Sequence, residues 1–437
     1  MNKTMRLRSI AYSSLNATNF RASIAPSNRG KLQKMTANIS EIEMPRTYSL
    51  LGVATMLFGV IIYTSANGFM TGGLAVAGRQ LGLSELQTGL ILGGGALIGV
   101  IAAPFWGYVS EILSPRKILL VAVPMVTLGP AAMAVIVGQW ILLPASIVGI
   151  ALGVARLIQA VFGAALIPVA QASIARYTLP SRRVSGMGTL SAVVSAGTLI
   201  GSALLWLTGK YGVVSGFATI AVFGVLASVC AAVFLPTTGA QTAISKGESV
   251  VPVQKILPYL LITLVGFTCY TTVPPIFALR LIDKFGFDSG SAASQTGLVL
   301  TVGVIAVCAA QVLIATRRNW KPTLMLQFGS IGIFIGLIML LPANDTFEMC
   351  LAMAIIGLAV GFLAPAILGA ISLLGGKGAQ GKIGGLNMAA RGLGSAIGPV
   401  VGTTLYQHNP DSPIIGSLFL IAGVLFLTFI LPKVNAN

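Results

Sequence analysis

Two arginines lie inside long apolar stretches, Arg156 in "ARLIQAVFGAA" and Arg391 in "AARGLGSAIG". A charge at the centre of a membrane helix costs about 2.5–3.5 kcal/mol, so such a residue is a functional candidate by default. All ten acidic residues fall outside the predicted spans, which leaves both arginines without an intramembrane carboxylate. Arginine does not titrate in proteins, but its planar fork binds carboxylate or phosphate through paired hydrogen bonds. We therefore expect both arginines to face a central cavity and to hold an anion together.

Polar residues also interrupt two other apolar runs. "YTSAN" places Tyr63 and Asn67 in the first run, and "YTT" places Tyr270 and Thr271 in the seventh. Such groups either line a cavity or form hydrogen bonds between helices, which are worth about 0.6–2 kcal/mol.

The composition indicates a membrane protein. Of the 437 residues, 55% are hydrophobic and 8% are charged, whereas soluble domains carry about 25% charged residues. The only histidine, His408, and the four cysteines offer no metal-binding or catalytic pattern. We expect neither an enzyme nor a bound metal or cofactor. The net charge of +17 indicates membrane orientation and not nucleic-acid binding, because the basic residues fall in short loops and one tail.

Twelve apolar runs have the length of a membrane-spanning helix. The fold class predicted from them is an all-α membrane protein with twelve transmembrane helices. The runs are 50–70, 88–109, 118–137, 147–170, 186–207, 216–235, 256–278, 295–315, 324–341, 349–373, 383–406 and 415–431.

The distribution of basic residues predicts the orientation. Twenty-one of the 27 lysines and arginines lie in the N-terminal tail, the even-numbered connections and the C-terminal tail, and four lie in the opposite connections. Lysine and arginine are enriched on the cytoplasmic side. We therefore expect a multi-pass protein of the cytoplasmic (inner) membrane with both termini in the cytoplasm.

Four segments are predicted. Residues 1–48 form a basic cytoplasmic tail, 49–236 a first six-helix half, 237–255 a polar cytoplasmic linker, and 256–437 a second six-helix half. The Arg- and Ser-rich start of the tail is similar to an organellar transit peptide. A solvated basic tail and a true start at Met35 or Met44 are the alternatives. Because the first span begins near Leu50, we expect transport not to need residues 2–43.

The two halves repeat each other. "QTGLIL" from Gln87 recurs as "QTGLVL" from Gln295, "YTS" from Tyr63 as "YTT" from Tyr270, and "GTLIG" from Gly197 as "GSAIG". Three matches in the same order indicate an internal repeat. Paired six-helix repeats are an architecture of secondary transporters, which bind substrate near the membrane midplane between the repeats.

Two motifs resemble those of the major facilitator superfamily. "GYVSEILSPRK" is similar to the loop motif between spans two and three, with matches at Gly107, Glu111, Arg116 and Lys117 and with Ile112 in place of an arginine. "ARLIQAVFGAA" resembles the fourth-span motif, with matches at Arg156, Gln159 and Gly163.

A third motif resembles the antiporter motif of exporters. "GSAIGPVVG" has its pattern, with matches at Gly394, Gly398, Pro399 and Gly402, but it lies in span eleven and not in span five. Small residues spaced in this way also serve close helix packing alone. A similar second-half string occurs in tetracycline-type exporters, so the chain resembles the twelve-helix drug/proton antiporter branch.

This resemblance implies the major facilitator fold and roles for the matching residues. A latch between Glu111 and Arg116, with Gly107 and Lys117, and a hinge at Pro399 would control access to the cavity. Cavity contacts would come from the first helix of each half and from span four. The predicted substrate-binding residues are Arg156, Arg391, Tyr63, Asn67, Gln159, Tyr270 and Thr271.

We expect a secondary active transporter that works by alternating access and exports a small organic anion, such as a polycarboxylate metabolite or siderophore. Multidrug or amphiphile efflux by proton antiport, anion import or exchange, and a transporter-like sensor or channel remain alternatives. The expected partners are a small-molecule substrate, the lipid bilayer and a coupling proton or counter-ion, with no nucleic acid. We expect a monomer.

Overall fold

The computed structural model describes residues 50–177, 183–235, 253–316, 320–375 and 380–431. Every regular element in these ranges is a helix. The predicted basic tail 1–48 and all but the last three residues of the predicted linker 237–255 lie outside the described residues.

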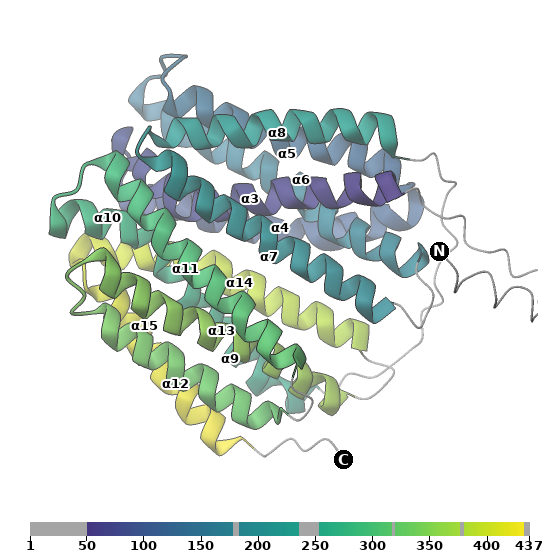
Figure 1. Ribbon diagram of the computed structural model, residues 1–437, viewed down its shortest axis with the longest axis vertical. Coiled ribbons are helices and arrows are strands. Elements are labelled where there is room, and N and C mark those ends of the chain that lie inside the picture. Colours follow the sequence, from purple (N-terminus) through teal and green to yellow (C-terminus); the bar gives the residue numbers. More distant parts are fainter. Residues whose placement is uncertain (1–49, 178–182, 236–252, 317–319, 376–379, 432–437) are drawn as a thin grey trace, which may run out of the picture. The chain divides into compact units, whose positions relative to one another are not determined.

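The first half of the chain contributes six long helices, drawn from purple to teal in Figure 1. They are α3 (Leu50–Gln80), α4 (Glu85–Ile112), α5 (Pro115–Val137), α6 (Ala145–Tyr177), α7 (Arg183–Gly209) and α8 (Val213–Phe234).

The second half contributes seven helical segments. They are α9 (Val253–Thr272), α10 (Pro274–Phe285), α11 (Ser289–Thr316), α12 (Pro322–Leu340), α13 (Thr346–Gly375), α14 (Gln380–His408) and α15 (Ser412–Ile430). The α9–α10 pair forms one span, interrupted at Val273. The interruption precedes two prolines, which cannot donate backbone hydrogen bonds to the preceding turn.

The prediction of twelve helical spans is confirmed. Eleven spans in the described ranges are long and apolar enough to cross a membrane. The twelfth, α14, has the length but is less apolar, because it is rich in glycine and carries Arg391. Several helices run further than the apolar pattern predicted. For example, α3 continues to Gln80 and α6 to Tyr177, since a helix persists where its sequence turns polar.

Local sequence explains several helix ends. Ser84 accepts a hydrogen bond from the backbone of Gln87, and the Gln87 side chain accepts one from the Ser84 backbone. This reciprocal capping box starts α4. Gly286 ends α10 with a φ of 69°, a left-handed conformation that glycine adopts without steric cost.

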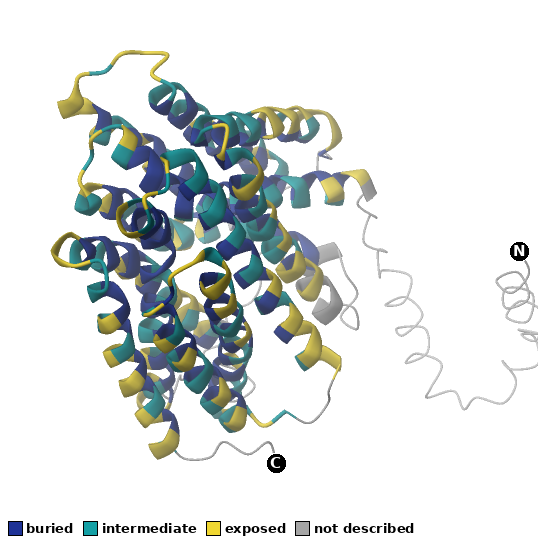
Figure 2. Cartoon of the chain, turned by 60° about the vertical axis from the view of Figure 1, so that its left-hand side comes forward, coloured by how far each residue is buried: buried dark blue, intermediate teal, exposed yellow. Residues whose placement is uncertain are grey.

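Buried apolar side chains form two clusters. Figure 2 colours the buried positions along the helices dark blue. One includes Phe69, Leu166 and Phe217 from the first half. The other includes Tyr259, Phe277 and Ile333 from the second half. Each set of helices thus has its own apolar core.

Two antiparallel helix pairs join the halves. α4 packs on α14, where Gly89 and Gly93 lie against the backbone of Pro399 and Ala396. α7 packs on α11, where Gly297 lies against Trp206. Glycine at these positions permits the close backbone approach.

The packing of α14 changes along its length. From Gly394 to Thr403 most of its residues are buried or half-buried, whereas from Lys382 to Leu393 they are half-buried or exposed, with Ile383 as the buried exception. The described ends of α7 and α11 near the same side are also largely exposed, including Thr189 and Val312. The halves are therefore packed together toward one end and separate toward the other.

Candidate functional site

Arg391 lies on α14 where the packed part of the helix gives way to the exposed part. Its guanidinium carbon is 4.5 Å from the ring centroid of Phe267 on α9, and Tyr270 lies within electrostatic range. The side chain is accessible to solvent, yet protein surrounds it at longer range. This combination is expected of a residue that lines an open cavity.

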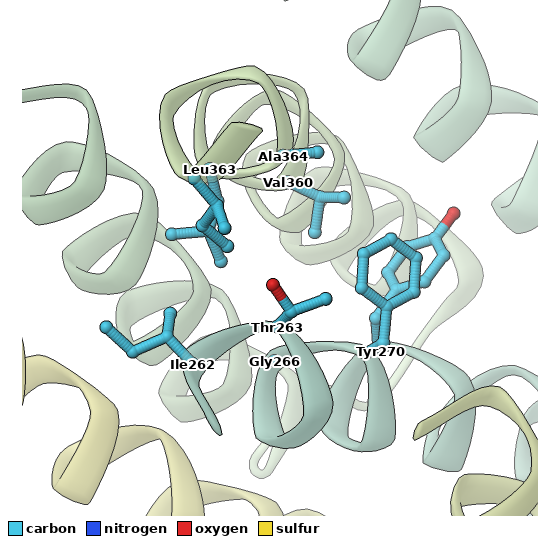
Figure 3. A pocket seen from close by; sticks show the side chains of 9 residues that line it. Ile262, Thr263, Gly266, Tyr270, Val360, Leu363 and Ala364 are labelled. Carbon is cyan, nitrogen blue, oxygen red and sulfur yellow. The ribbon is translucent and has the colours of Figure 1, made fainter. Parts of the chain in front are cut away.

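A small apolar pocket adjoins this arginine, between α9 and α13. Figure 3 shows Ile262, Thr263, Gly266 and Tyr270 on one side and Val360, Leu363 and Ala364 on the other. Its free volume is about 10 Å³, room for at most one water molecule.

Thr263 connects this pocket to α14. Its hydroxyl donates to the Asn387 side chain at 2.8 Å, one helical turn before Arg391. Phe267 and Tyr270, which lie beside Arg391, also line the pocket. The charge, the two aromatic rings and the pocket therefore form one continuous surface of the second half.

Arg156 has different surroundings, although the sequence predicted the same role for it. Its residue is only 7% exposed. Its Nη1 donates to the Gln159 side-chain oxygen at 2.8 Å, and its aliphatic part and Nε lie against Gly95 of α4. Arg156 Nε and Gln159 Nε2 have no hydrogen-bond partner among the described residues.

Tyr63 lies near Arg156, and Asn67 follows it one helical turn later on α3. The Tyr63 ring packs against Gly163 of α6 and lies within electrostatic range of Arg156. The Asn67 amide donates to the Tyr63 backbone at 2.9 Å. Both residues are half-buried.

Thr271 contacts the backbone of α14 and not the Arg391 side chain. Its hydroxyl is 2.8 Å from the Phe267 carbonyl and 3.3 Å from the Gly394 carbonyl. The neighbouring Thr272 similarly reaches the Gly398 carbonyl at 3.2 Å. The two threonine hydroxyls therefore stabilise the packing of α9 on α14.

The glycine motif of α14 packs on α9. Gly394, Gly398 and Gly402 lie against the backbone or side chains of Phe267, Thr271 and Thr272. Pro399 lies inside the continuous helix, and its carbonyl accepts a hydrogen bond from Thr403 at 2.8 Å. The motif thus forms a tight helix contact, and its gating role stays a prediction.

The predicted latch at the end of α4 is described in part. Gly107 is half-buried and accepts a bond from Ser110 at 2.7 Å. Arg116 donates to the Ala232 carbonyl at the end of α8 at 3.2 Å, and Lys117 is exposed. The Glu111 side chain lies outside the described part, so its contact with Arg116 stays a prediction.

A polar cluster at the opposite end of the bundle was missed by the sequence analysis. Arg79 of α3 pairs with Glu85 of α4 at 2.5 Å and also with Asp283 of α10. From α14, Tyr406 donates to Asp283 at 3.0 Å and Gln407 to Glu85 at 3.4 Å. The five residues connect both halves.

Arg280 lies beyond the predicted seventh span, 256–278, so the sequence placed it in a loop, and the structure shows that this prediction is wrong. It lies inside α10, is 1% exposed, and donates to Asp411 at 2.5 Å and to the Leu341 carbonyl at 2.6 Å. Glu85, Asp283 and Glu348, also assigned to loops, lie within α4, α10 and α13. Apolarity alone located the runs, and these helices continue through charged residues.

Curated proteins similar to this chain are named as drug-resistance proteins. Multidrug resistance protein 1 of Bacillus subtilis is 24% identical over 63% of this chain and 72% of its own length. Quinolone resistance protein NorA of Staphylococcus aureus is 20% identical over 86% of this chain and 95% of its own length.

Solved transporter structures share the fold. A D-xylose-proton symporter matches with a TM-score of 0.70 at 15% identity, covering 89% of this chain and 99% of that chain. A POT family transporter in complex with 5-aminolevulinic acid matches with a TM-score of 0.69 at 11% identity, covering 87% and 95%.

The family profile described as Major Facilitator Superfamily matches residues 55–399 and 260–435. These matches span both apolar cores, both central arginines and the glycine motif of α14. The chain belongs to the Major Facilitator Superfamily and is a multi-pass membrane transporter.

Proposed function

We propose that the chain exports small organic anions by alternating access, with Arg391 as the residue that recognises the negative charge. The observation that carries this proposal is an accessible guanidinium, stacked on Phe267, that takes part in none of the ion pairs among the described residues. A cation in a partly desolvated site favours a ligand that brings a counter-charge.

The surroundings of Arg391 narrow the substrate class. Phe267 and Tyr270 provide aromatic surface beside the charge. A carboxylate with an apolar or aromatic portion fits this surface. A polycarboxylate metabolite or a siderophore with such a portion belongs to this class.

Two observations support export. Relatives over most of the chain are named for multidrug or quinolone resistance. The solvent-exposed ends of α7, α11 and α14 lie on one side of the bundle. From the bias of basic residues we assign that side to the cytoplasm. An open cytoplasmic side is the state that would accept a substrate from inside the cell.

Multidrug efflux by proton antiport is the second candidate, and the name of the Bacillus subtilis multidrug resistance relative favours efflux of drugs. It requires a titratable group. The acidic side chains that the structure describes lie toward the helix ends, including Glu85 and Asp283. A proton-coupled mechanism would therefore have to use these peripheral carboxylates or one outside the described residues.

Transport into inside-out vesicles tests the two candidates. Wild type, Arg391→Lys and Arg391→Gln would be compared with aromatic carboxylates, citrate-like anions and cationic dyes. Losing a charge-assisted hydrogen bond costs about 1.5–3 kcal/mol, so we expect Arg391→Gln to weaken organic-anion binding about ten- to a hundredfold. Arg391→Lys should retain part of the flux, because it keeps the charge without the fork.

The cationic dyes decide between the candidates. If they are carried well and Arg391→Gln leaves or improves their transport, the organic-anion proposal is wrong and multidrug efflux takes its place. Ser395→Ala is a suitable control, since Ser395 lies one turn away and, among the described residues, its hydroxyl donates to the Arg391 carbonyl alone, at 3.0 Å.

A further inference from the structure

Arg156 and Gln159 form a buried pair with two unused donors. The Arg156 residue is 7% exposed and Gln159 is fully buried. Their mutual hydrogen bond of 2.8 Å uses Nη1 of the arginine and the oxygen of the amide. Arg156 Nε and Gln159 Nε2 remain without a partner among the described residues. Native proteins seldom leave buried donors unpaired.

The pair also carries an uncompensated charge. The ion pairs of the described residues involve Arg79 and Arg280, and not Arg156. The acid on α4 nearest to Gly95 is Glu85, ten residues before it and so about 15 Å along the helix axis, and Glu85 pairs with Arg79. Tyr63 lies within electrostatic range, but no carboxylate of the described residues forms an ion pair with Arg156. Because arginine stays protonated, the charge needs a counter-ion from outside the chain.

Two glycines shape the space around the pair. A Cβ at Gly95 would collide with Arg156 Nε, Cγ and Cδ, and a Cβ at Gly129 of α5 would lie 2.7 Å from the Gln159 Cβ. The two side chains therefore occupy slots that only glycine leaves open.

We propose that Arg156 and Gln159 bind a small monovalent inorganic anion such as chloride, in a site separate from the organic-anion site at Arg391. An anion satisfies both unused donors and neutralises the guanidinium, whereas a water molecule would satisfy the donors and leave the charge. Nearly complete burial restricts the ligand to the size of a halide or nitrate. This assignment does not depend on the proposed function, because it concerns the first half alone.

Chloride titration of the purified full-length protein in nanodiscs tests the site. Chloride would replace gluconate at constant ionic strength while the thermal unfolding midpoint is measured. A ligand that binds only the folded state raises that midpoint in a saturable way. We expect a rise of about 2 °C or more for chloride, bromide and nitrate, with none for gluconate. A wild-type midpoint that is the same in chloride and gluconate overturns the proposal.

Three variants locate the effect. Arg156→Gln should abolish the chloride-dependent shift, and Gly95→Ala should reduce chloride affinity at least about tenfold by displacing the guanidinium. Arg391→Gln is the matched control, an arginine in the other half, and should retain the full shift. A shift that persists in Arg156→Gln, or that disappears only in Arg391→Gln, places the anion elsewhere and overturns the assignment.

Bromide makes the test independent of any variant that fails to fold. Crystals of the wild-type protein grown in bromide should show an anomalous peak beside Arg156 Nε, and a water molecule there without anomalous signal would overturn the proposal.

Competition with organic anions separates the two proposals. If chloride and the organic anion exclude each other and both need Arg156, there is one shared site, and the proposal of a separate chloride site is overturned. If Arg391→Gln leaves organic-anion binding unchanged while the chloride shift still requires Arg156, the proposed function fails and the chloride site stands.

Discussion

Arg79 on α3 forms an ion pair with Asp283 on α10, although 204 residues separate them in the chain. Arg79 also holds Glu85, and α14 contributes Tyr406 and Gln407 to the same cluster. The cluster joins the halves at the end where they are packed together. It therefore has to break whenever that end opens.

Asp283→Asn should favour opening at this end. The Arg79 and Asp283 side chains are about one-third exposed, and partly exposed ion pairs are worth roughly 0.2–1 kcal/mol. We expect the equilibrium to shift up to about fivefold toward the open state. Distances between spin labels on the ends of α3 and α10 in nanodiscs would measure the two populations.

Asp288→Asn is the control. The Ser291 side chain and backbone hold the pKa of Asp288 below its usual range, and this carboxylate lies outside the cluster. An unchanged distance distribution in Asp283→Asn would contradict a gating role.

The sequence allowed the membrane fold and the position of both central arginines to be predicted, because each depends on local pattern. A charge inside an apolar run is visible without a structure, as for Arg156 and Arg391. The ion-pair partner of a charged residue cannot be identified from the sequence. Nothing local to Arg79 points to Asp283, and Arg280 reads as a loop residue until the helix begun at Pro274 is known to continue past it.

The difference between the two arginines also required the structure. Both occur in glycine-rich helices, and the sequence predicts one role for them. Arg156 is buried because Gly95 of α4 admits its side chain, whereas Arg391 lies over Phe267 where α14 leaves the packed interface. Such differences arise from tertiary packing.

Asp411→Asn should destabilise the second half. Arg280 is 1% exposed and relies on Asp411 and the Leu341 carbonyl for its hydrogen bonds. Removing a charged partner of a buried group costs about 1.5–3 kcal/mol. Thermal unfolding in nanodiscs should show a lower midpoint for Asp411→Asn than for Lys284→Gln, an exposed charge change on the same helix as Arg280. Equal midpoints would mean that solvent replaces Asp411.

The orientation can be tested with a matched pair of cysteine substitutions. Lys210 lies between α7 and α8, and Lys321 lies just before α12; both are exposed. In a background without the four native cysteines, Lys210→Cys should react with an impermeant maleimide in intact cells. Lys321→Cys should react only after permeabilisation. The opposite pattern would reverse the predicted topology and with it the inference of export.

Pro399→Ala should slow transport more than it weakens substrate binding. Proline lacks a backbone N–H and therefore leaves the Ser395 carbonyl without its usual helical donor. The surrounding turn is bordered by Gly398, which lies against Thr271 of α9, and by the Pro399 carbonyl, which faces Gly89 of α4. A local change of helix curvature at this point would move α14 against helices of both halves.

Alanine restores the missing donor and stiffens this turn without altering Arg391 or Phe267. We expect the maximal rate in vesicles to fall several-fold while the half-saturating substrate concentration stays within about twofold. The stiffer helix slows the conformational change but leaves the contacts that bind the substrate unchanged. Pro413→Ala is the control, because Pro413 lies in the first turn of α15, where a backbone N–H has no helical partner in any case. Equal rates for Pro399→Ala and Pro413→Ala would reduce the glycine–proline motif to a packing contact, and a parallel loss of binding would place Pro399 in the substrate site.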